Sequence, residues 1–313
     1  MENIHENLIQ KIIFKHFGKN AEKIERMRVG LANEVYSVQV NGSDYIVRMN
    51  ERESIKGSGK YIPLFKSLGI KIPELIIEDY SKELISYNYQ ILNKIKGVDI
   101  KKVIATLPEE QLQNIAKEIA DIIKKLINVP TNGLFGYVGI TEEKLEPSLN
   151  VVVEKMLNKI KERNAKTGVV KKEYIEIFEK ILVKYEKYFR NVKSEFYFDD
   201  MSSKNVIIHN GKFNGIVDLD GVAYGDFLES IGRIKASWYG TKYGEYYTNA
   251  VMDSLNLNEE QRKIVIMWAL LNVTWWQSEL GIQFNQNSSI NIDPKKVQRN
   301  NVRIDGLIKE LSL

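Results

Sequence analysis

Acidic side chains gather in one short segment of the chain, and their types suit metal and phosphate chemistry. Residues 195–229 contain seven carboxylates and only two lysines. Asp199 and Asp200 end one run of apolar and aromatic residues, and Asp218 and Asp220 end another. Carboxylates brought together repel one another unless a cation neutralises them, and oxygen ligands favour Mg²⁺ over zinc. The segment therefore predicts a Mg²⁺ site, with a solvated acidic loop as the alternative.

A calcium-binding loop is another site that acids at short spacing can form. Asp218, Asp220 and Glu229 would fill the first, third and twelfth positions of an EF-hand loop. The sixth position needs glycine for its sharp turn, but Ala223 stands there. The spacing excludes this type of calcium site.

The spacing of Asp200, Asn205 and Asp218 is similar to the catalytic loop and metal-binding aspartate of protein-kinase-like phosphotransferases. A closer resemblance, to the aminoglycoside phosphotransferase and choline kinase family of small-molecule kinases, is carried by the stretch FYFDDMSSKNVIIHNGKFNGIVDLDGVAYGDFLES. That family commonly reads H-G-D-L-x-x-x-N, then I-D-F/W, then G-D-P, and Gly225-Asp226 fits the last motif. The resemblance extends with gaps over roughly two-thirds of the chain and implies a two-lobed kinase fold.

The resemblance also implies a role for each residue of the motif. Asp200 would be the catalytic base that accepts the proton of a substrate hydroxyl. Asn205 and Asp218 would hold Mg²⁺ against the phosphates of ATP or GTP, and Lys204 would reach the γ-phosphate. Asp226 is expected to be structural and to support the catalytic loop.

The chain departs from the family pattern directly beside the expected base. Phe198-Asp199 replaces the usual His-Gly, so a ring that can only pack stands where histidine forms hydrogen bonds, and a negative charge is added. Asp220 is either a further metal ligand or an exposed acid. A non-catalytic nucleotide-binding pseudokinase or scaffold is therefore the alternative function, although the three residues that the chemistry requires are present.

The first third of the chain carries weaker matches to the nucleotide-binding part of the family. Gly30-Leu-Ala-Asn33 resembles the loop that covers the phosphates. Arg48 stands where kinases place the phosphate-binding lysine, and arginine still offers a permanent cation to the α- and β-phosphates. The alternative for Arg48 is a solvent-facing cation at the end of a strand.

The resemblance places two further nucleotide contacts in the same region. Glu53, on the helix that follows Arg48, is the expected partner of that arginine, with Glu51 as an alternative. The backbone near Asn93 to Ile95 resembles the kinase hinge and is expected to hydrogen-bond the adenine.

A small α+β lobe is predicted for residues 1–95. Apolar residues at helical spacing favour a helix over 3–17, and Asn41-Gly42 is a strong signal for a β-hairpin. The other expected elements of this lobe are strands at 24–29, 35–40, 45–49, 72–78 and 86–94 and a helix at 53–67.

A mainly helical lobe is predicted for residues 96–313. Thr106-Leu-Pro-Glu109 fits a capping box that opens a helix with a buried face, and Asn210-Gly211 predicts a second hairpin, between 206–208 and 213–217. Further helices are expected at 148–164, 171–190, 226–238, 242–255, 259–281 and 294–311.

The helices of residues 242–313 are expected to form the pocket for a small-molecule hydroxyl acceptor. Helical spacing places Trp268 and Trp275 in the core, whereas Trp276 faces another way and lines the predicted pocket. Residues 282–313 hold three acids against five bases, which disfavours polycationic aminoglycosides relative to choline, another amino alcohol, a sugar or another antibiotic. Six residues between Asp218 and Gly225 are too few for the activation segment of a protein kinase.

Composition excludes several other classes of protein. The 313 residues include 45 Lys+Arg, 41 Asp+Glu, three histidines and no cysteine, so no disulfide, Cys-ligated zinc or thiol nucleophile is expected. The near balance of charge gives no general case for nucleic acid or an anionic membrane as partner. The N-terminal residues lack the apolar core of a signal peptide, which predicts a cytoplasmic protein. The composition does not specify an oligomeric state.

Overall fold

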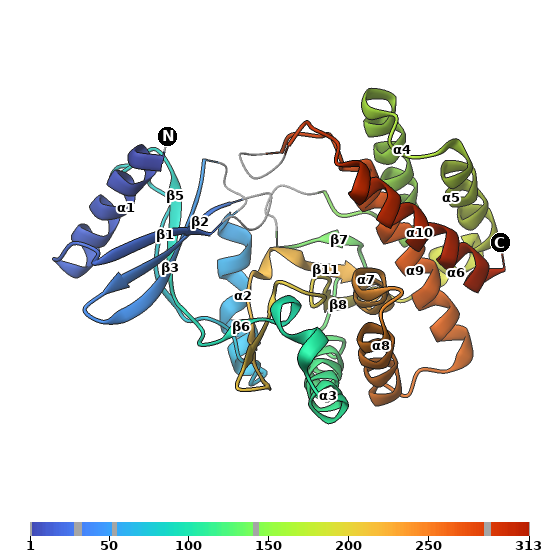
Figure 1. The fold of residues 1–313 in the computed structure, drawn as a ribbon, viewed down its shortest axis with the longest axis horizontal. Helices are drawn as coiled ribbons and strands as arrows, with labels where there is room; N and C mark the ends of the chain where they lie inside the picture. The colour runs from blue at the N-terminus through green and yellow to red at the C-terminus, as the bar shows by residue number, and fades with distance from the viewer. Residues whose placement is uncertain (1, 28–32, 52–54, 140–143, 285–288, 313) are drawn as a thin grey trace.

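A computed structural model describes residues 2–27, 33–51, 55–139, 144–284 and 289–312. Figure 1 shows a strand-rich lobe that carries the N-terminus and a helical lobe that carries the C-terminus, with the two ends of the chain far apart. The predicted α+β two-lobed architecture is confirmed. The boundary between residues 95 and 96 stays a prediction; just beyond it, β6 (Val98–Asp99) already pairs with a strand of the helical lobe.

An antiparallel sheet forms the strand-rich lobe, and its five described strands follow the order β1-β2-β3-β5-β4. The predicted Asn41-Gly42 turn joins β2 to β3, and both residues take positive φ values of 52° and 71°, as a tight hairpin requires. The strands are β1 (Lys23–Met27), β2 (Glu34–Val40), β3 (Ser43–Asn50), β4 (Leu75–Asp79) and β5 (Asn88–Asn93).

Two helices of the strand-rich lobe belong to different cores. The predicted first helix is α1 (Glu2–Phe17), which buries Ile12 and Ile13 in a cluster with side chains of the sheet. The second, α2 (Ile55–Ser67), contributes its apolar side chains to the core of the helical lobe. Its Phe65 lies edge-on to Phe198, with ring centroids 6.5 Å apart. Through α2 the strand-rich lobe thus contributes to the core of the helical lobe, while α1 and the sheet form a core of their own.

The helical lobe contains most of the predicted helices and the predicted hairpin. Asn210 and Gly211 again take positive φ, and β9 pairs antiparallel with β10 across them. The described strands of this lobe form the sheets β10-β9-β6 and β7-β11-β8, with β7 (Gly136–Tyr137), β8 (Glu195–Phe198), β9 (Val206–His209), β10 (Lys212–Ile216) and β11 (Val222–Gly225). The helices are α3 (Glu109–Leu126), α4 (Leu149–Thr167), α5 (Lys172–Lys184), α6 (Glu186–Asn191), α7 (Leu228–Trp238), α8 (Lys242–Ser254), α9 (Glu259–Ser278) and α10 (Pro294–Leu311).

Two local expectations were wrong. Helix α3 has Pro108 as its N-cap residue and no side-chain capping bond, so Thr106 and Glu109 form no capping box. The Thr106 hydroxyl instead donates to the carbonyl of Val103 (2.9 Å), because a short 3₁₀ turn precedes the helix and supplies a nearer acceptor. The single helix predicted for 171–190 is divided at Tyr185 into α5 and α6.

None of the described helices is both long enough and apolar enough to cross a bilayer.

Candidate active site

The loop between β8 and β9 carries the expected base. Asp200 is partly exposed in this loop, and the hydroxyl of Ser202 donates to its Oδ1 (3.0 Å). The indole N–H of Trp238 donates to the carbonyl of Ser202 (2.8 Å), which anchors the loop to α7. At the end of the loop, the Asn205 carbonyl accepts a hydrogen bond from the N–H of Val217 (2.9 Å). The loop is thereby joined to the segment that carries the second expected metal ligand.

That second ligand, Asp218, begins a short turn after β10. It adopts φ 65° and ψ 70°, a left-handed conformation that is uncommon for residues other than glycine. Such conformations cost free energy and concentrate at functional sites. The strain is consistent with a backbone bent to present the carboxylate of Asp218, which keeps 44% of its side-chain surface exposed.

The pKa of Asp218 responds to the charges of several other residues of the predicted site. Partial desolvation and the adjacent Asp220 carboxylate raise the pKa of Asp218 to about 6, while Arg48 opposes the shift. The charge of Asp200 adds to the increase, and the exposed Lys204 counteracts it. Asp200, Lys204 and Asp218 are therefore near enough to influence one another.

Arg48 connects the two lobes at this point. Its Nη2 donates to Asp218 Oδ1 (2.9 Å) and to Asp220 Oδ2 (2.8 Å), across 170 and 172 residues of sequence. The side chain is only 9% exposed, so the alternative of a solvent-facing cation is wrong. Burial alone would lower the pKa of Arg48, but the carboxylates of Asp220 and Asp218 raise it overall. A permanent cation thus faces the expected metal ligands.

Asn33 adds a second connection between the lobes. Its side-chain N–H donates to Asp220 Oδ2 (2.9 Å), and its carbonyl accepts from the side chain of Asn50 (2.9 Å). Asp220 is therefore not a plainly exposed acid, because Arg48 and Asn33 both hold it. Gly30 and Glu53, the other two residues expected in this part of the site, lie outside the described residues.

The expected hinge follows β5. The backbone N–H of Asn93 donates to the carbonyl of Glu74 (3.0 Å), and its side-chain oxygen accepts from the N–H of Glu74 (2.5 Å). Ile95 lies in the connection to β6, with its side chain close to Gly215 of β10. The adenine contacts at Asn93 and Ile95 stay predictions.

Asp199, the unexpected acid beside the base, has its charge neutralised. Arg233 Nη1 lies 2.5 Å from Asp199 Oδ2, and the hydroxyl of Tyr137 donates to the same oxygen (2.7 Å). The sequence did not identify Arg233 or Tyr137 as part of the site. A charged residue between the apolar positions Ile231 and Ile234 of α7 was the one local signal that pointed to a buried partner.

Asp226 is structural, as expected, but its partners differ from the expectation. Its carboxylate accepts hydrogen bonds from the Trp268 indole (2.6 Å), the Tyr188 hydroxyl (2.7 Å) and the backbone N–H of Leu228 (3.0 Å). These groups belong to α9, α6 and α7. Asp226 therefore joins three helices, and none of these hydrogen bonds reaches the catalytic loop.

Glu229 gives a pH-dependent contribution to stability that can be measured. Burial and the nearby Asp199 raise its pKa to about 7, with a hydrogen bond from the Tyr197 hydroxyl opposing the increase. The pKa of Glu229 is about 4.5 in the unfolded chain and about 7 in the folded protein. Its contribution to the free energy of unfolding is therefore fully present below about pH 4.5 and is lost as the pH rises through 7. Glu229→Gln keeps the hydrogen-bond acceptor without the charge, so we expect it to increase the free energy of unfolding at pH 8 by about 2 kcal/mol.

Urea unfolding of both proteins at pH 5, 6, 7 and 8 measures this difference. Stability should decrease with pH less steeply in Glu229→Gln than in the wild type. Parallel curves over this range would contradict the raised pKa of Glu229.

The side chains expected at the acceptor pocket lie next to Arg233. Its guanidinium lies 5.8 Å from the ring of Trp276, whereas Trp268 is buried in the core. The ring of the preceding residue, Trp275, lies 4.1 Å from the guanidinium of Arg163, measured to the ring centroid. The predicted acceptor residue Trp276 is thus one side chain away from the Asp199–Arg233 pair.

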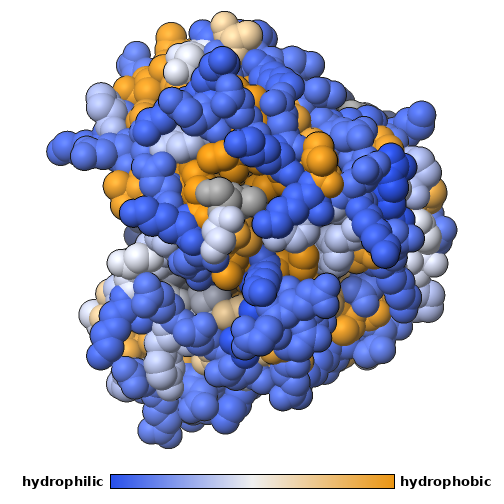
Figure 2. Space-filling model, turned by 90° about the vertical axis from the view of Figure 1, so that its right-hand side faces the viewer, coloured by the Kyte–Doolittle hydropathy of each residue, from blue (hydrophilic) through white to orange (hydrophobic). Residues whose placement is uncertain are grey.

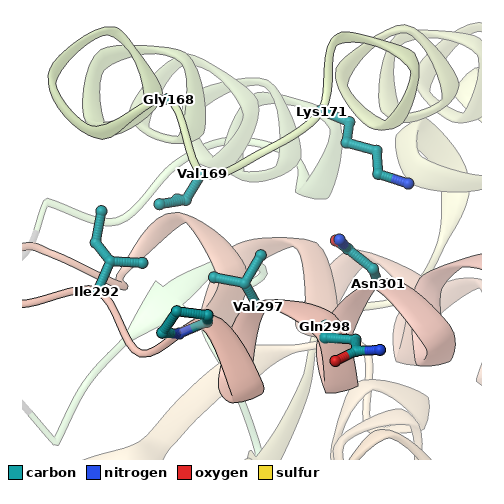
Figure 3. Close-up of a pocket in the computed structure, with 8 residues that line it drawn as sticks. Gly168, Val169, Lys171, Ile292, Val297, Gln298 and Asn301 are labelled. Carbon is teal, nitrogen blue, oxygen red and sulfur yellow. The ribbon is translucent and has the colours of Figure 1, made fainter.

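A groove on the surface of the helical lobe lies apart from the site between the lobes. This groove of about 470 Å³ between the α4–α5 connection and α10 is lined by Val169, Ile292 and Val297, with Lys171 at one end (Figure 3). Figure 2 shows a largely hydrophilic face with some apolar side chains gathered near its middle. Neither Asp200 nor the expected metal ligands line this groove.

The donors at the interlobe site suit Mg²⁺ and nucleotide phosphates. Asn205 and Asp218 supply an amide and a carboxylate, and the buried Oδ1 of Asp220 has no hydrogen-bond partner among the described residues. Mg²⁺ in kinase sites is held by one or two protein carboxylates together with substrate phosphates. No three His, Cys, Asp or Glu side chains of the described ranges cluster as a metal site of their own.

Fold and site together define a two-lobed, protein-kinase-like small-molecule phosphotransferase. Residues 23–258 match the model of the phosphotransferase enzyme family. The match includes the strands of the strand-rich lobe, the catalytic loop and the segment of Asp218. The chain therefore belongs to that family, as the resemblance of its motifs predicted.

Solved structures with this fold include several aminoglycoside phosphotransferases. The chain is similar to a thermostable mutant of aminoglycoside phosphotransferase APH(4)-Ia in complex with AMP-PNP and hygromycin B, at 15% identity and a TM-score of 0.69, over 96% of this chain and 98% of that one. It is also similar to a Haemophilus somnus protein assigned as a fructosamine-3-kinase, at 13% identity and a TM-score of 0.65, over 96% of both chains. No curated protein matches the chain by sequence.

Proposed function

We propose that the protein transfers the γ-phosphoryl group of ATP or GTP to a hydroxyl group of a small molecule. The acceptor oxygen forms a bond to the γ-phosphorus as the bond between that phosphorus and the β–γ bridging oxygen breaks, which releases the nucleoside diphosphate. Asp200 orients the acceptor hydroxyl and receives its proton. Asn205 and Asp218 hold Mg²⁺, which neutralises the phosphate charge when bound. Lys204 and Arg48 face the phosphates.

The observation that carries this proposal is the convergence of Arg48 with Asp218. One belongs to the strand-rich lobe and the other follows the catalytic loop, yet Arg48 Nη2 and Asp218 Oδ1 lie 2.9 Å apart. The hydrogen bond between the Asn205 carbonyl and Val217 brings the loop of Asp200 to the same place. Phosphoryl transfer depends chiefly on such positioning and on charge neutralisation.

The pairing of Asp199 weakens the case for a non-catalytic scaffold. That alternative rested on the replacement of His-Gly by Phe198-Asp199. Phe198 is fully buried in the apolar core, and Arg233 compensates the added charge. The departure therefore leaves the expected base and both metal ligands in place.

The acceptor is proposed to carry few positive charges. The neighbours in complex with hygromycin B and with gentamicin are themselves aminoglycoside phosphotransferases. In this chain, α10 carries five cationic side chains against two acids. This charge balance favours a neutral or singly charged hydroxyl compound, such as a sugar or an amino alcohol, over a polycation.

Thermal unfolding with nucleotide and acceptor tests the function. Mg²⁺ with ATP or GTP at a hundredfold excess over Kd is expected to raise the melting temperature by about 4 °C, because a ligand of the folded state stabilises it by about 2.7 kcal/mol. Sugars, amino alcohols, macrolides and aminoglycosides are then added, and the class that raises it further is tested for phosphorylation. A shift with nucleotide that does not need Mg²⁺, without transfer to any acceptor, would support the scaffold.

A further inference from the structure

Asp199 is held more firmly than a surface acid would be. It is 3% exposed, although it stands where the family pattern has glycine. Its Oδ2 accepts from Arg233 Nη1 at 2.5 Å and from the Tyr137 hydroxyl at 2.7 Å. The two donors come from α7 and β7, so elements distant in the sequence fix the residue that precedes Asp200.

The same residue contacts the turn that follows the metal ligand. The N–H of Asp199 donates to the carbonyl of Gly221 (3.0 Å), which continues the pairing of β8 with β11. A Cβ on Gly221 would overlap Asp199 Oδ1, so the absence of a side chain there leaves room for the carboxylate. Gly221 ends the short turn that starts after Asp218. Asp199 therefore touches both the loop of the base and the loop of the metal ligand.

The charge of the base also acts on Arg233, the partner of Asp199. Burial would lower the pKa of Arg233, but Asp199 and, after it, Asp200 raise the pKa well above its ordinary value. The guanidinium is thus charged and close enough to Asp200 to feel its carboxylate.

We propose that Asp199 is a positioning residue for phosphoryl transfer. Held by Arg233 and packed on Gly221, it fixes Asp200 relative to Asp218. The proposal rests on the roles proposed above for Asp200 and Asp218. A displacement of about 1 Å in such a geometry lowers the rate roughly a hundredfold. We therefore expect substitution of Asp199 to lower kcat.

The first test removes the charge of Asp199 while keeping its shape. Asp199→Asn and Arg233→Met are compared with the wild type in steady-state hydrolysis of Mg²⁺·ATP, with water as acceptor, and in calorimetric binding of Mg²⁺·ATP. We expect kcat to fall by between tenfold and a hundredfold, with the Kd for Mg²⁺·ATP within about threefold of the wild type. A kcat within twofold of the wild type in Asp199→Asn would overturn the proposal.

A steric variant tests the same contact without changing any charge. Gly221→Ala places a methyl group against Asp199 Oδ1, and we expect it to lower kcat at least tenfold. Asp199→Gly removes the overlapping carboxylate, so Gly221→Ala should lower kcat much less in that background than in the wild type. Equal effects in the two backgrounds would show that Gly221 acts independently of Asp199, and would overturn the proposal even if Asp199→Asn failed to fold.

Asp226→Asn is the matched control. Asp226 is also buried (2% exposed) and accepts from a tyrosine hydroxyl, but its partners join helices away from the catalytic loop. Asp226→Asn should lower the melting temperature of the ligand-free protein. It should leave the kcat of the folded protein within twofold of the wild type. A loss of kcat as large as that of Asp199→Asn would mean that any buried carboxylate has this effect. If Asp200→Asn kept full turnover, the proposed function would fail instead.

Discussion

Replacement of Asp200 by asparagine is expected to lower turnover by about 10³-fold, within the 10²–10⁴ that general base catalysis contributes. The amide keeps the size of the side chain and can still accept the hydrogen bond that the Ser202 hydroxyl makes to Oδ1 (3.0 Å). It cannot receive the proton of the acceptor hydroxyl. Since Asp200 makes no ion pair with Arg48, binding of Mg²⁺·ATP should stay within about threefold of the wild type.

Single-turnover kinetics and calorimetry separate these two effects. The rate of the chemical step is measured at saturating Mg²⁺·ATP, and Kd is measured independently. Asp253→Asn is the control, because Asp253 lies on α8 with 69% of its side chain exposed and pairs only with Arg262 among the described residues. Turnover in Asp200→Asn equal to that of Asp253→Asn would refute the role of Asp200.

The parts of the fold that the sequence predicted are those with local causes. Asn41-Gly42 and Asn210-Gly211 need positive φ values at two successive residues, and asparagine and glycine supply them whatever surrounds the turn. The buried face of α3 follows from apolar residues at helical spacing. All of them are buried: Leu112, Ile115, Ile119, Ile122, Ile123 and Leu126. Local signals of this kind do not depend on the rest of the chain.

The expectations that were wrong concern competition between local partners. Thr106 has the residue type and spacing of a capping box, but an acceptor three residues earlier, the carbonyl of Val103, takes its hydroxyl. At Tyr185 the backbone leaves the helical region, with φ −105° and ψ 11°, and divides a segment whose apolar pattern continues. Neither outcome is visible in residue type alone.

Contacts within the site depend on tertiary structure. The motif identified Asp200, Asn205 and Asp218 because their spacing along the chain is short and typical. The pair Asp199–Arg233 joins residues 34 positions apart, and Asp220 is held by a residue 172 positions away. No spacing rule relates such residues, so the sequence revealed neither of these pairings.

Asp218→Asn is expected to remove the dependence of nucleotide binding on Mg²⁺ and to lower turnover at least a hundredfold. The amide is a weaker ligand for a hard cation than a carboxylate, and charge neutralisation at the phosphates is the main source of catalysis in this chemistry. The ligand-free protein should remain folded, because Arg48 keeps its 2.8 Å contact with Asp220 and Asp218 is already 44% exposed.

Binding of ATP with and without Mg²⁺ distinguishes loss of the metal from general damage to the site. In the wild type, Mg²⁺ should lower the Kd for ATP; in Asp218→Asn, the two values should coincide near the metal-free value of the wild type. That pattern would assign the metal to Asp218, because Arg48, the proposed phosphate ligand, is unchanged in both proteins. If the variant kept the full effect of Mg²⁺ on affinity, the metal would have to be held elsewhere, and Asp220, whose buried Oδ1 has no partner in the described part of the chain, would be the next ligand to replace.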